Sequence, residues 1–354
     1  MTAIVAARRT AVCPRGGAFA RLSLEQLAAP VIAEVLADSG LGAGDVDEVI
    51  CANALGAGGN PARRVALAAG LPTRVAGLSI DRQCAGGLDA IRLAVAMVAA
   101  GQARVVIAGG VESYSRRPVR LMTDAEGAPP VAYDQARFTP WADRDPDMAV
   151  AAHALAQRLG ISRAAQDAWA VASHAKAMGQ NFPEIVPVEG VAQDTFTRAL
   201  TMAQAGRAKP IAGSITAGNA AVAADAAAFV LVVADDLATS KAMRILASAT
   251  IGADPEEPGL SPLPAIRAVW GGTPLHRVEM MEAYAIQAMA CVVQAGIDPN
   301  TVNLHGGALA RGHPIGASGA ILAVRLFHDL QAGQQGLAAI AAAGGIGTAI
   351  RFGR

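Results

Sequence analysis

The fold class follows from residues 79–113, SIDRQCAGGLDAIRLAVAMVAAGQARVVIAGGVES. An apolar strand ends near Asp81, and apolar residues then recur at helical spacing until Gly101 ends the pattern. A second apolar strand follows this helix and runs into a Gly-Gly pair. Strand, helix and strand in this order predict an α/β protein with a buried sheet.

The same order of elements returns near the end of the chain. Residues 336–348, GLAAIAAAGGIGT, repeat residues 101–113, GQARVVIAGGVES, at an offset of 235 residues, and each strand is expected to end in a Gly-Gly turn. The offset places Gly319 opposite Cys84, at the start of another apolar helix. Two similar α/β halves are the simplest interpretation, and chance similarity in a chain rich in alanine and glycine is the alternative. Two further segments also echo each other, residues 39–55 and 295–309.

Between the two halves the periodicity weakens. Residues 114–146 are rich in Arg, Asp and Pro and are predicted as loop. Residues 148–159 and 163–178 show the spacing of amphipathic helices, and residues 184–210 are irregular. We therefore expect an inserted loop domain. The predicted division of the chain is an N-terminal half of residues 1–113 with 215–239, a loop domain of residues 114–214, and a C-terminal half of residues 240–354.

Composition and charge exclude several kinds of protein. The 354-residue chain is 53% hydrophobic, and it carries 29 basic and 29 acidic residues, which argues against a nucleic-acid partner. The most apolar stretch, residues 211–234, contains Asn219 and Asp225, so no membrane span is expected. The four cysteines lack CxxC spacing, which favours free thiols in a reducing, cytoplasmic setting. No metal site is predicted.

Cys84 is the first candidate for chemistry. It precedes an apolar helix, and Gly86 and Gly87 clear space around it. Free N–H groups and the dipole at a helix start favour a thiolate there. The alternative, a buried structural cysteine, has about equal weight on position alone.

His313 is the second candidate. It lies in the segment GGALARGHPIGASGA, residues 306–320, where small side chains leave room for a narrow ligand or a second catalytic residue. A histidine in such a place can polarise a thiol or donate a hydrogen bond to a developing oxyanion. A structural histidine in a loop is the alternative.

Together these segments resemble the thiolase family over essentially the whole chain. The resemblance implies a thiolase fold, a duplicated five-layer αβαβα core with an inserted loop domain, in agreement with the internal repeat. It also implies acyl-CoA as substrate, no permanently bound cofactor, and a homodimer or homotetramer. The matching pieces are DRQCAGGLDA (81–90), AGGVESYS (108–115), TAGNAAVAADAAA (216–228), MEAYA (281–285), GGALARGHPIGASGA (306–320) and AAAGGIGTAI (341–350).

The resemblance assigns roles to individual residues. Cys84 matches the nucleophile that carries the acyl group, and His313 matches the histidine that activates it and helps to form one oxyanion hole. The backbone N–H groups of Cys84 and Ala343 match the second oxyanion hole, which holds the thioester oxygen. The positions that would contact coenzyme A are Arg198 at the nucleotide end and Ala217 and Ala221 along the pantetheine arm.

Two departures from the family pattern bear on the reaction. Ala341 stands where thiolases carry a second cysteine, which acts as the acid and base of the carbon–carbon step. Met281 replaces the Asn of the family's NEAF motif, which orders a water in the first oxyanion hole. His305 is a candidate auxiliary residue that could replace the lost base, and a polar turn residue is the alternative.

The sequence therefore predicts an acyl-CoA C-acyltransferase that carries the acyl group on Cys84. Its reaction is either reversible Claisen condensation and thiolysis or a modified acyl transfer. One alternative is a thiolase-like protein that acylates Cys84 but hydrolyses or retains the acyl group. Another is a non-catalytic subunit that binds coenzyme A. A decarboxylating ketoacyl synthase fits less well, because its first catalytic histidine would fall at Met281.

Overall fold

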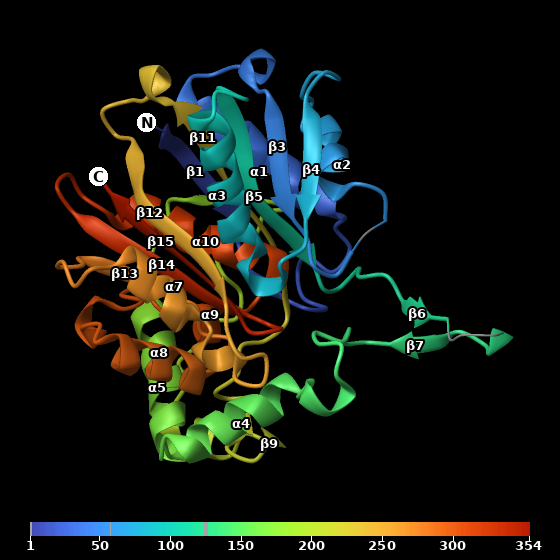
Figure 1. Ribbon diagram of the computed structural model, residues 1–354, viewed down its shortest axis with the longest axis vertical. Helices are drawn as coiled ribbons and strands as arrows, with labels where there is room; N and C mark the ends of the chain where they lie inside the picture. The colour runs from blue at the N-terminus through green and yellow to red at the C-terminus, as the bar shows by residue number, and fades with distance from the viewer. Residues whose placement is uncertain (1, 57, 124–126) are drawn as a thin grey trace.

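The computed structural model describes residues 2–56, 58–123 and 127–354. One large sheet runs through both halves of this part of the chain (Figure 1). Its long strands are β1 (Thr2–Thr10), β3 (Glu48–Ala52), β4 (Ala76–Ile80), β5 (Val105–Ser113), β11 (Ala224–Ala234), β12 (Met243–Gly252), β13 (Arg277–Met280), β14 (Gln335–Ala342) and β15 (Ile346–Gly353). Their order is β13-β14-β15-β12-β1-β11-β5-β3-β4. The short strands β2 (Cys13–Pro14) and β8 (Ile185–Val186) pair with β11 and β1.

This strand order contains the same pattern twice. In the first half β3 is parallel to β5, and β11 is antiparallel to both β5 and β1. In the second half β13 is parallel to β14, and β15 is antiparallel to both β14 and β12. The strands β1, β3, β5 and β11 therefore correspond to β12, β13, β14 and β15. The predicted duplication is confirmed by this connectivity.

Five layers follow from the way the helices cover the two halves of the sheet. Helices α3 (Gly86–Ala99) and α10 (Ile315–Asp329) contact each other and also contact strands of both halves, so they form the central layer. Helices α1 (Leu24–Ser39) and α2 (Pro61–Ala68) cover the outer face of the first half. Helices α7 (Pro262–Val269) and α8 (Ala285–Ala295) cover the second half. The result is the expected αβαβα arrangement.

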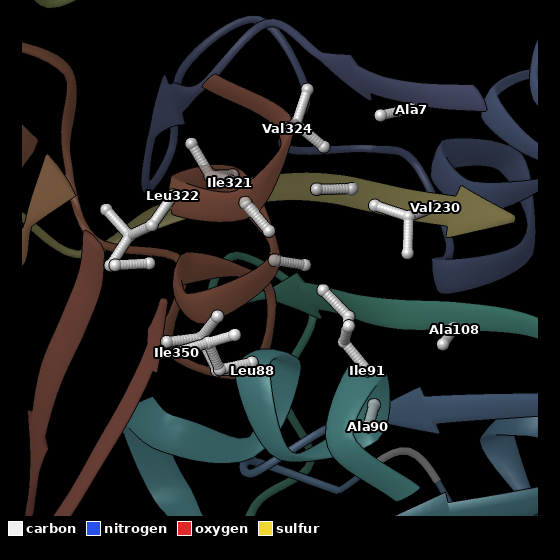
Figure 2. Close-up of a cluster of buried hydrophobic side chains, with 14 of the residues drawn as sticks. Ala7, Leu88, Ala90, Ile91, Ala108, Val230, Ile321, Leu322, Val324 and Ile350 are labelled. Carbon is white, nitrogen blue, oxygen red and sulfur yellow. The ribbon is translucent and has the colours of Figure 1, made fainter. Parts of the chain in front are cut away.

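Small residues allow the two central helices to approach closely. A Cβ atom on Gly87 would lie 2.5 Å from the backbone nitrogen of Ala320, and one on Gly319 would lie 2.5 Å from that of Leu88. Glycine is therefore needed on both helices at this crossing. Around it, Ile91 of α3 packs with residues of α10, β11 and β15 in one apolar cluster, as Figure 2 shows.

The repeat lies in a different register from the one expected. The predicted offset of 235 residues is wrong, because the equivalent helices α3 and α10 begin at Gly86 and Ile315, which are 229 residues apart. Gly109 and Gly110 also lie inside β5 and not in a turn. Cys84 therefore corresponds to His313, not to Gly319, and each of the two precedes its central helix by two residues.

The predicted similarity between residues 39–55 and 295–309 pairs segments that are not equivalent, because the second segment lies one element too far along the chain. The segment 39–55 contains β3, whose counterpart is β13, whereas the segment 295–309 follows α8. Val302 in that segment forms only an isolated parallel bridge with Val278 of β13. This is the place that β4 occupies beside β3 in the first half.

The segment between β5 and β11 carries the additional elements. Helices α4 (Met148–Arg158) and α5 (Arg163–Ala177) confirm the predicted helices, and they lie below the C-terminal half in Figure 1. The predicted loop before them contains a two-stranded hairpin that projects from the body. The three-way domain division stays a prediction. The remaining elements are β6 (Arg120–Met122), β7 (Val131–Tyr133), α6 (Met202–Gly206), β9 (Pro210–Ala212), β10 (Ile215–Thr216) and α9 (Ala308–Arg311).

Hydropathy of the helices bears on the question of a membrane span. Among the helices that the structure describes, none is both long enough and apolar enough to cross a bilayer. The most apolar stretch of the sequence forms strand β11 and the short strands before it.

Candidate active site

Cys84 lies in a tight turn between β4 and α3. The turn spans Gln83–Ala85 and leads directly into the helix at Gly86. Gln83 takes a left-handed conformation with φ of +46°, which is rare for a residue with a side chain. The side chain of Asp81 accepts a hydrogen bond from its backbone N–H at 2.8 Å and holds this strained conformation. The thiol is thereby presented at the start of the central helix.

His313 contacts the thiol directly. The distance from Cys84 Sγ to His313 Nε2 is 3.0 Å, although the two residues are 229 positions apart in the chain. The backbone N–H of His313 donates to the carbonyl of Val222 at 2.7 Å, and this bond fixes the loop against the segment that leads into β11. The structure therefore brings together the two residues that were predicted to be catalytic.

Ser318 determines which ring nitrogen of His313 carries the proton. Its hydroxyl donates to the carbonyl oxygen of Pro314 at 3.1 Å, and its Oγ lies 2.7 Å from His313 Nδ1. Because the hydroxyl proton is already used, Ser318 accepts from Nδ1–H. Nε2 is then unprotonated and faces the thiol, which is the arrangement of a general base. Sequence reasoning missed Ser318, although the segment around His313 contains it.

Burial sets the charge state of this pair. Burial raises the pKa of the Cys84 thiol to about 12, although the backbone N–H groups of Cys84 and Ala343 act to lower it. Burial also lowers the pKa of His313 to about 4. The expectation that the helix start would favour a thiolate was wrong, because loss of hydration outweighs the nearby N–H groups. The resting pair is a neutral thiol and a neutral imidazole.

These pKa values predict how acylation depends on pH. His313 must be neutral to take the thiol proton, a condition met above its pKa of about 4, and Cys84 keeps that proton until the pH approaches its pKa of about 12. We expect the rate of Cys84 acylation to stay level between about pH 5 and pH 10. Quenched-flow mass spectrometry across that range measures it. A rate that rises with a midpoint near neutral pH would instead show that a thiolate must form first.

Two backbone N–H groups were predicted to form an oxyanion hole, those of Cys84 and Ala343. The backbone N–H groups of Cys84 and Ala343 both act to lower the pKa of the Cys84 thiol, although burial outweighs them. Ala343 follows the end of β14, and Gly344 and Gly345 complete the turn with φ of +81° and +72°. Two N–H groups from different halves of the chain therefore converge on one point, where they can stabilise a negatively charged oxygen.

Glu112 links the elements that carry the catalytic residues. Its carboxylate accepts from Ala54 N at 3.0 Å, from Asn53 Nδ2 at 2.6 Å and from Gly316 N, in the first turn of α10, at 3.0 Å. Burial raises its pKa to about 7. This side chain ties the end of β5 to the helix that follows His313. Sequence reasoning did not single it out.

A pocket of about 380 Å³ opens beside the Cys84–His313 pair. Ala341 lines it, as do Ala343 and Ala221. Met281 does not appear among the described lining residues, and only 1% of it is exposed, within the central apolar cluster. The pocket lining also includes Leu55, Tyr114, Arg117, Tyr284, Gln287 and Ile315.

The remaining predicted residues lie outside the described lining of this pocket. His305 Nδ1 lies 3.1 Å from Asp329 Oδ2 and 2.9 Å from a guanidinium nitrogen of Arg325, and it does not face Cys84. Ala217 is exposed. The guanidinium of Arg198 stacks on the Phe196 ring at 4.2 Å from its centroid. Among the described residues, no His, Cys, Asp and Glu side chains gather as a metal site would require.

Comparison with known proteins decides the family. Residues 2–236 match the family model for the thiolase N-terminal domain, and residues 239–354 match that for the thiolase C-terminal domain. The chain belongs to the thiolase family.

Relatives of this thiolase align over nearly its whole length. "Putative acetyl-CoA C-acetyltransferase YhfS" of Bacillus subtilis is 38% identical, over 99% of this chain and 98% of the relative. "Acetyl-CoA acetyltransferase" of Pseudomonas aeruginosa is 37% identical over the same shares of the two chains. The crystal structure of the Bacillus anthracis acetyl-CoA acetyltransferase superimposes with a TM-score of 0.91 at 32% identity, covering 99% of this chain and 98% of the other. The thiolase fold is thus confirmed.

Proposed function

We propose that this thiolase is an acyl-CoA C-acyltransferase that carries the acyl group on Cys84. The observation that carries the proposal is the 3.0 Å contact between Cys84 Sγ and the unprotonated Nε2 of His313. The names of the relatives, which describe acetyl-CoA acetyltransferases, also support it. A buried nucleophile beside a positioned base is the arrangement that acyl transfer requires.

The acylation step follows from the geometry. As Sγ attacks the thioester carbon, His313 Nε2 takes the thiol proton, and the imidazolium is held by the Nδ1–H bond to Ser318. The thioester oxygen becomes negative and is stabilised by the N–H groups of Cys84 and Ala343. The bond to the coenzyme A sulfur then breaks, and the sulfur recovers the proton from His313.

Coenzyme A is proposed as a substrate that binds transiently, with no permanent cofactor. Ala221 lines the pocket, so the pantetheine arm would enter beside it. Ala217 is exposed four residues earlier, and Arg198 remains the proposed contact for the nucleotide end. We further propose a cytoplasmic location, a homodimer or homotetramer, and no nucleic-acid partner.

The fate of the acyl group separates the proposal from its alternatives. Condensation and thiolysis need an acid and base near C2 of the substrate, and Ala341 cannot serve. Hydrolysis or retention of the acyl group needs no such residue. The close Cys84–His313 contact favours an enzyme over a subunit that only binds coenzyme A.

Intact-mass spectrometry of the full chain tests the proposal. The protein is incubated with acetyl-, butyryl- and longer acyl-CoAs, and free coenzyme A is measured in parallel. We expect a mass increase of one acyl group for at least one thioester, with release of one coenzyme A per chain. An unchanged mass with no release of coenzyme A from any thioester would refute acylation and leave the binding-subunit alternative.

Ala341→Cys is expected to raise thiolysis of acetoacetyl-CoA about tenfold or more. Only 7% of Ala341 is exposed, and what is exposed faces the pocket, so the added sulfur enters the space beside Cys84. The loss of acetoacetyl-CoA absorbance measures the rate. Ala341→Ser is the matched control, because a hydroxyl has similar size but is a much weaker acid. An equal gain from serine would contradict the acid–base explanation.

A further inference from the structure

Two phenol groups in the catalytic pocket have no role so far. Tyr114 and Tyr284 both line the pocket that contains Cys84, His313 and Ala341. Among the described residues, neither hydroxyl has a hydrogen-bond partner. The chain has three tyrosines, and the third, Tyr133, lies on the β6–β7 hairpin outside the described lining of the pocket.

The backbone around Tyr114 is rigidly held. Tyr114 directly follows the last residue of β5, the strand that also carries Glu112. Its neighbour Ser115 donates from the backbone N–H to Asp225 Oδ1 at 2.9 Å and from the hydroxyl to Asp225 Oδ2 at 2.5 Å. Asp225 is fully buried in β11. The phenol is therefore presented to the pocket from a fixed point at the end of a central strand.

The environment of Tyr114 keeps its phenol protonated in the pocket that it shares with Cys84. Burial raises the pKa of Tyr114 above its usual range. The guanidinium of Arg117 lies 5.3 Å from the centre of the Tyr114 ring and acts in the opposite direction, because a cation stabilises a phenolate.

We propose that the hydroxyl of Tyr114 is the acid and base of the carbon–carbon step, in place of the cysteine that Ala341 lacks. This inference rests on the proposed function, since it needs an acyl group on Cys84. It draws on the pocket that Tyr114 shares with Cys84 and Ala341, and on the absence of a described partner for the hydroxyl.

Protons and electrons balance in both parts of thiolysis. Cys84 gives its thiol proton to His313 and attacks C3 of the 3-oxoacyl-CoA, and the C2–C3 bond then breaks with its electron pair on C2. Tyr114 gives its proton to C2, which releases acetyl-CoA, leaves the shortened acyl group as a thioester on Cys84, and leaves a phenolate. The phenolate then takes the proton of an incoming coenzyme A thiol, and the resulting thiolate attacks the thioester on Cys84. The Cys84 sulfur leaves and recovers its proton from His313. Condensation is the reverse.

A phenol suits this cycle because of the order of acidities. A carbon acid next to a thioester is a much weaker acid than a phenol, and a phenol is a weaker acid than a thiol. Each proton transfer in thiolysis therefore runs downhill, from phenol to carbanion and from thiol to phenolate. Arg117, stacked on the ring, stabilises the phenolate that exists between the two transfers.

Tyr114→Phe tests the inference, because it removes one oxygen and keeps the ring. We expect thiolysis of acetoacetyl-CoA to fall by ~10²–10⁴-fold, while the rate of Cys84 acylation by acetyl-CoA stays within about twofold of wild type. Adding Ala341→Cys to Tyr114→Phe should restore most of the lost thiolysis. If the hydroxyl only supported the structure, a thiol at position 341 of β14 would not restore thiolysis in Tyr114→Phe. Tyr133→Phe is the matched control and should leave both rates unchanged.

The outcomes separate this inference from the proposed function. Failure of wild type to acylate Cys84 refutes the proposed function itself. If wild type acylates Cys84 but shows no measurable thiolysis, the role of Tyr114 is overturned and the proposed acyl transfer still stands. Unchanged thiolysis in Tyr114→Phe also overturns it, as does a larger loss in Tyr284→Phe. Equal losses of acylation and thiolysis in Tyr114→Phe would mean that the hydroxyl supports the structure and not the carbon–carbon step.

Discussion

Cys84→Ser is expected to abolish the acyl mass increase that wild type shows with acyl-CoA. Serine keeps the size of the side chain, but a hydroxyl is a far weaker nucleophile than a thiol. The surroundings would remain intact, because the turn at Gln83–Ala85 and the N–H groups of Cys84 and Ala343 belong to the backbone. Intact-mass spectrometry after prolonged incubation measures the effect. We expect no acylated species above background.

The matched control is another cysteine of the same chain. Cys13 is fully buried, and burial raises its pKa to about 11, so it is a poor nucleophile. Cys13→Ala should acylate like wild type if it folds, and circular dichroism checks folding. A mass increase that survives Cys84→Ser would place the nucleophile elsewhere and would contradict the assignment.

His313→Ala is expected to slow acylation by ~10²–10⁴-fold. The variant loses the imidazole whose Nε2 lies 3.0 Å from Cys84 Sγ. In the described part of the chain, no other side-chain base is in contact with that sulfur. Because the pKa of Cys84 is raised to about 12, few thiolates form at neutral pH without that base. Rapid-quench mass spectrometry with acetyl-CoA gives the rate. A partial recovery of the variant at high pH would agree with the lost proton acceptor.

His305→Ala is the comparison for this variant. His305 pairs with Asp329 and Arg325, and it does not line the described part of the pocket. Its removal should change acylation by less than about threefold. Equal losses in the two variants would show that His305 shares the site and would revive its auxiliary role.

Much of the fold could be predicted from periodicity and glycine positions. Helices α4 and α5 lie within one residue of their predicted ends, because their apolar spacing is regular. The register of the repeat could not be predicted, because a Gly-Gly pair has two uses in this chain. Gly109 and Gly110 lie inside β5, where β11 approaches Gly109 and α10 approaches Gly110, whereas Gly344 and Gly345 form the turn after β14.

The candidate site was predicted in part. Motif context led to Cys84 and His313, which the structure places in contact. Ser318, Glu112 and Tyr114 were not singled out, because their roles depend on partners that lie close only after folding. The charge state of the thiol was also missed, since a local helix start says nothing about how deeply a sulfur is buried.

Met281 is a position where the sequence pattern suggested a substitution that its burial in the structure argues against. The family pattern suggested that Met281→Asn would supply a missing oxyanion contact. In the structure only 1% of Met281 is exposed, in the central apolar cluster, and it is not among the described lining residues of the pocket. An amide there would need a polar partner that the cluster does not offer, at a cost of about 1–3 kcal/mol. The substitution is therefore a poor companion for Ala341→Cys.

The correspondence between Cys84 and His313 also bears on how the two halves can differ. The two residues occupy the same place in the two copies, and these places meet at 3.0 Å. A chain with perfect internal symmetry would set two thiols or two imidazoles against each other there. Two like groups have the same affinity for a proton, so neither drives transfer from the other. Catalysis at this junction therefore requires that the copies be unequal in sequence while they remain alike in backbone.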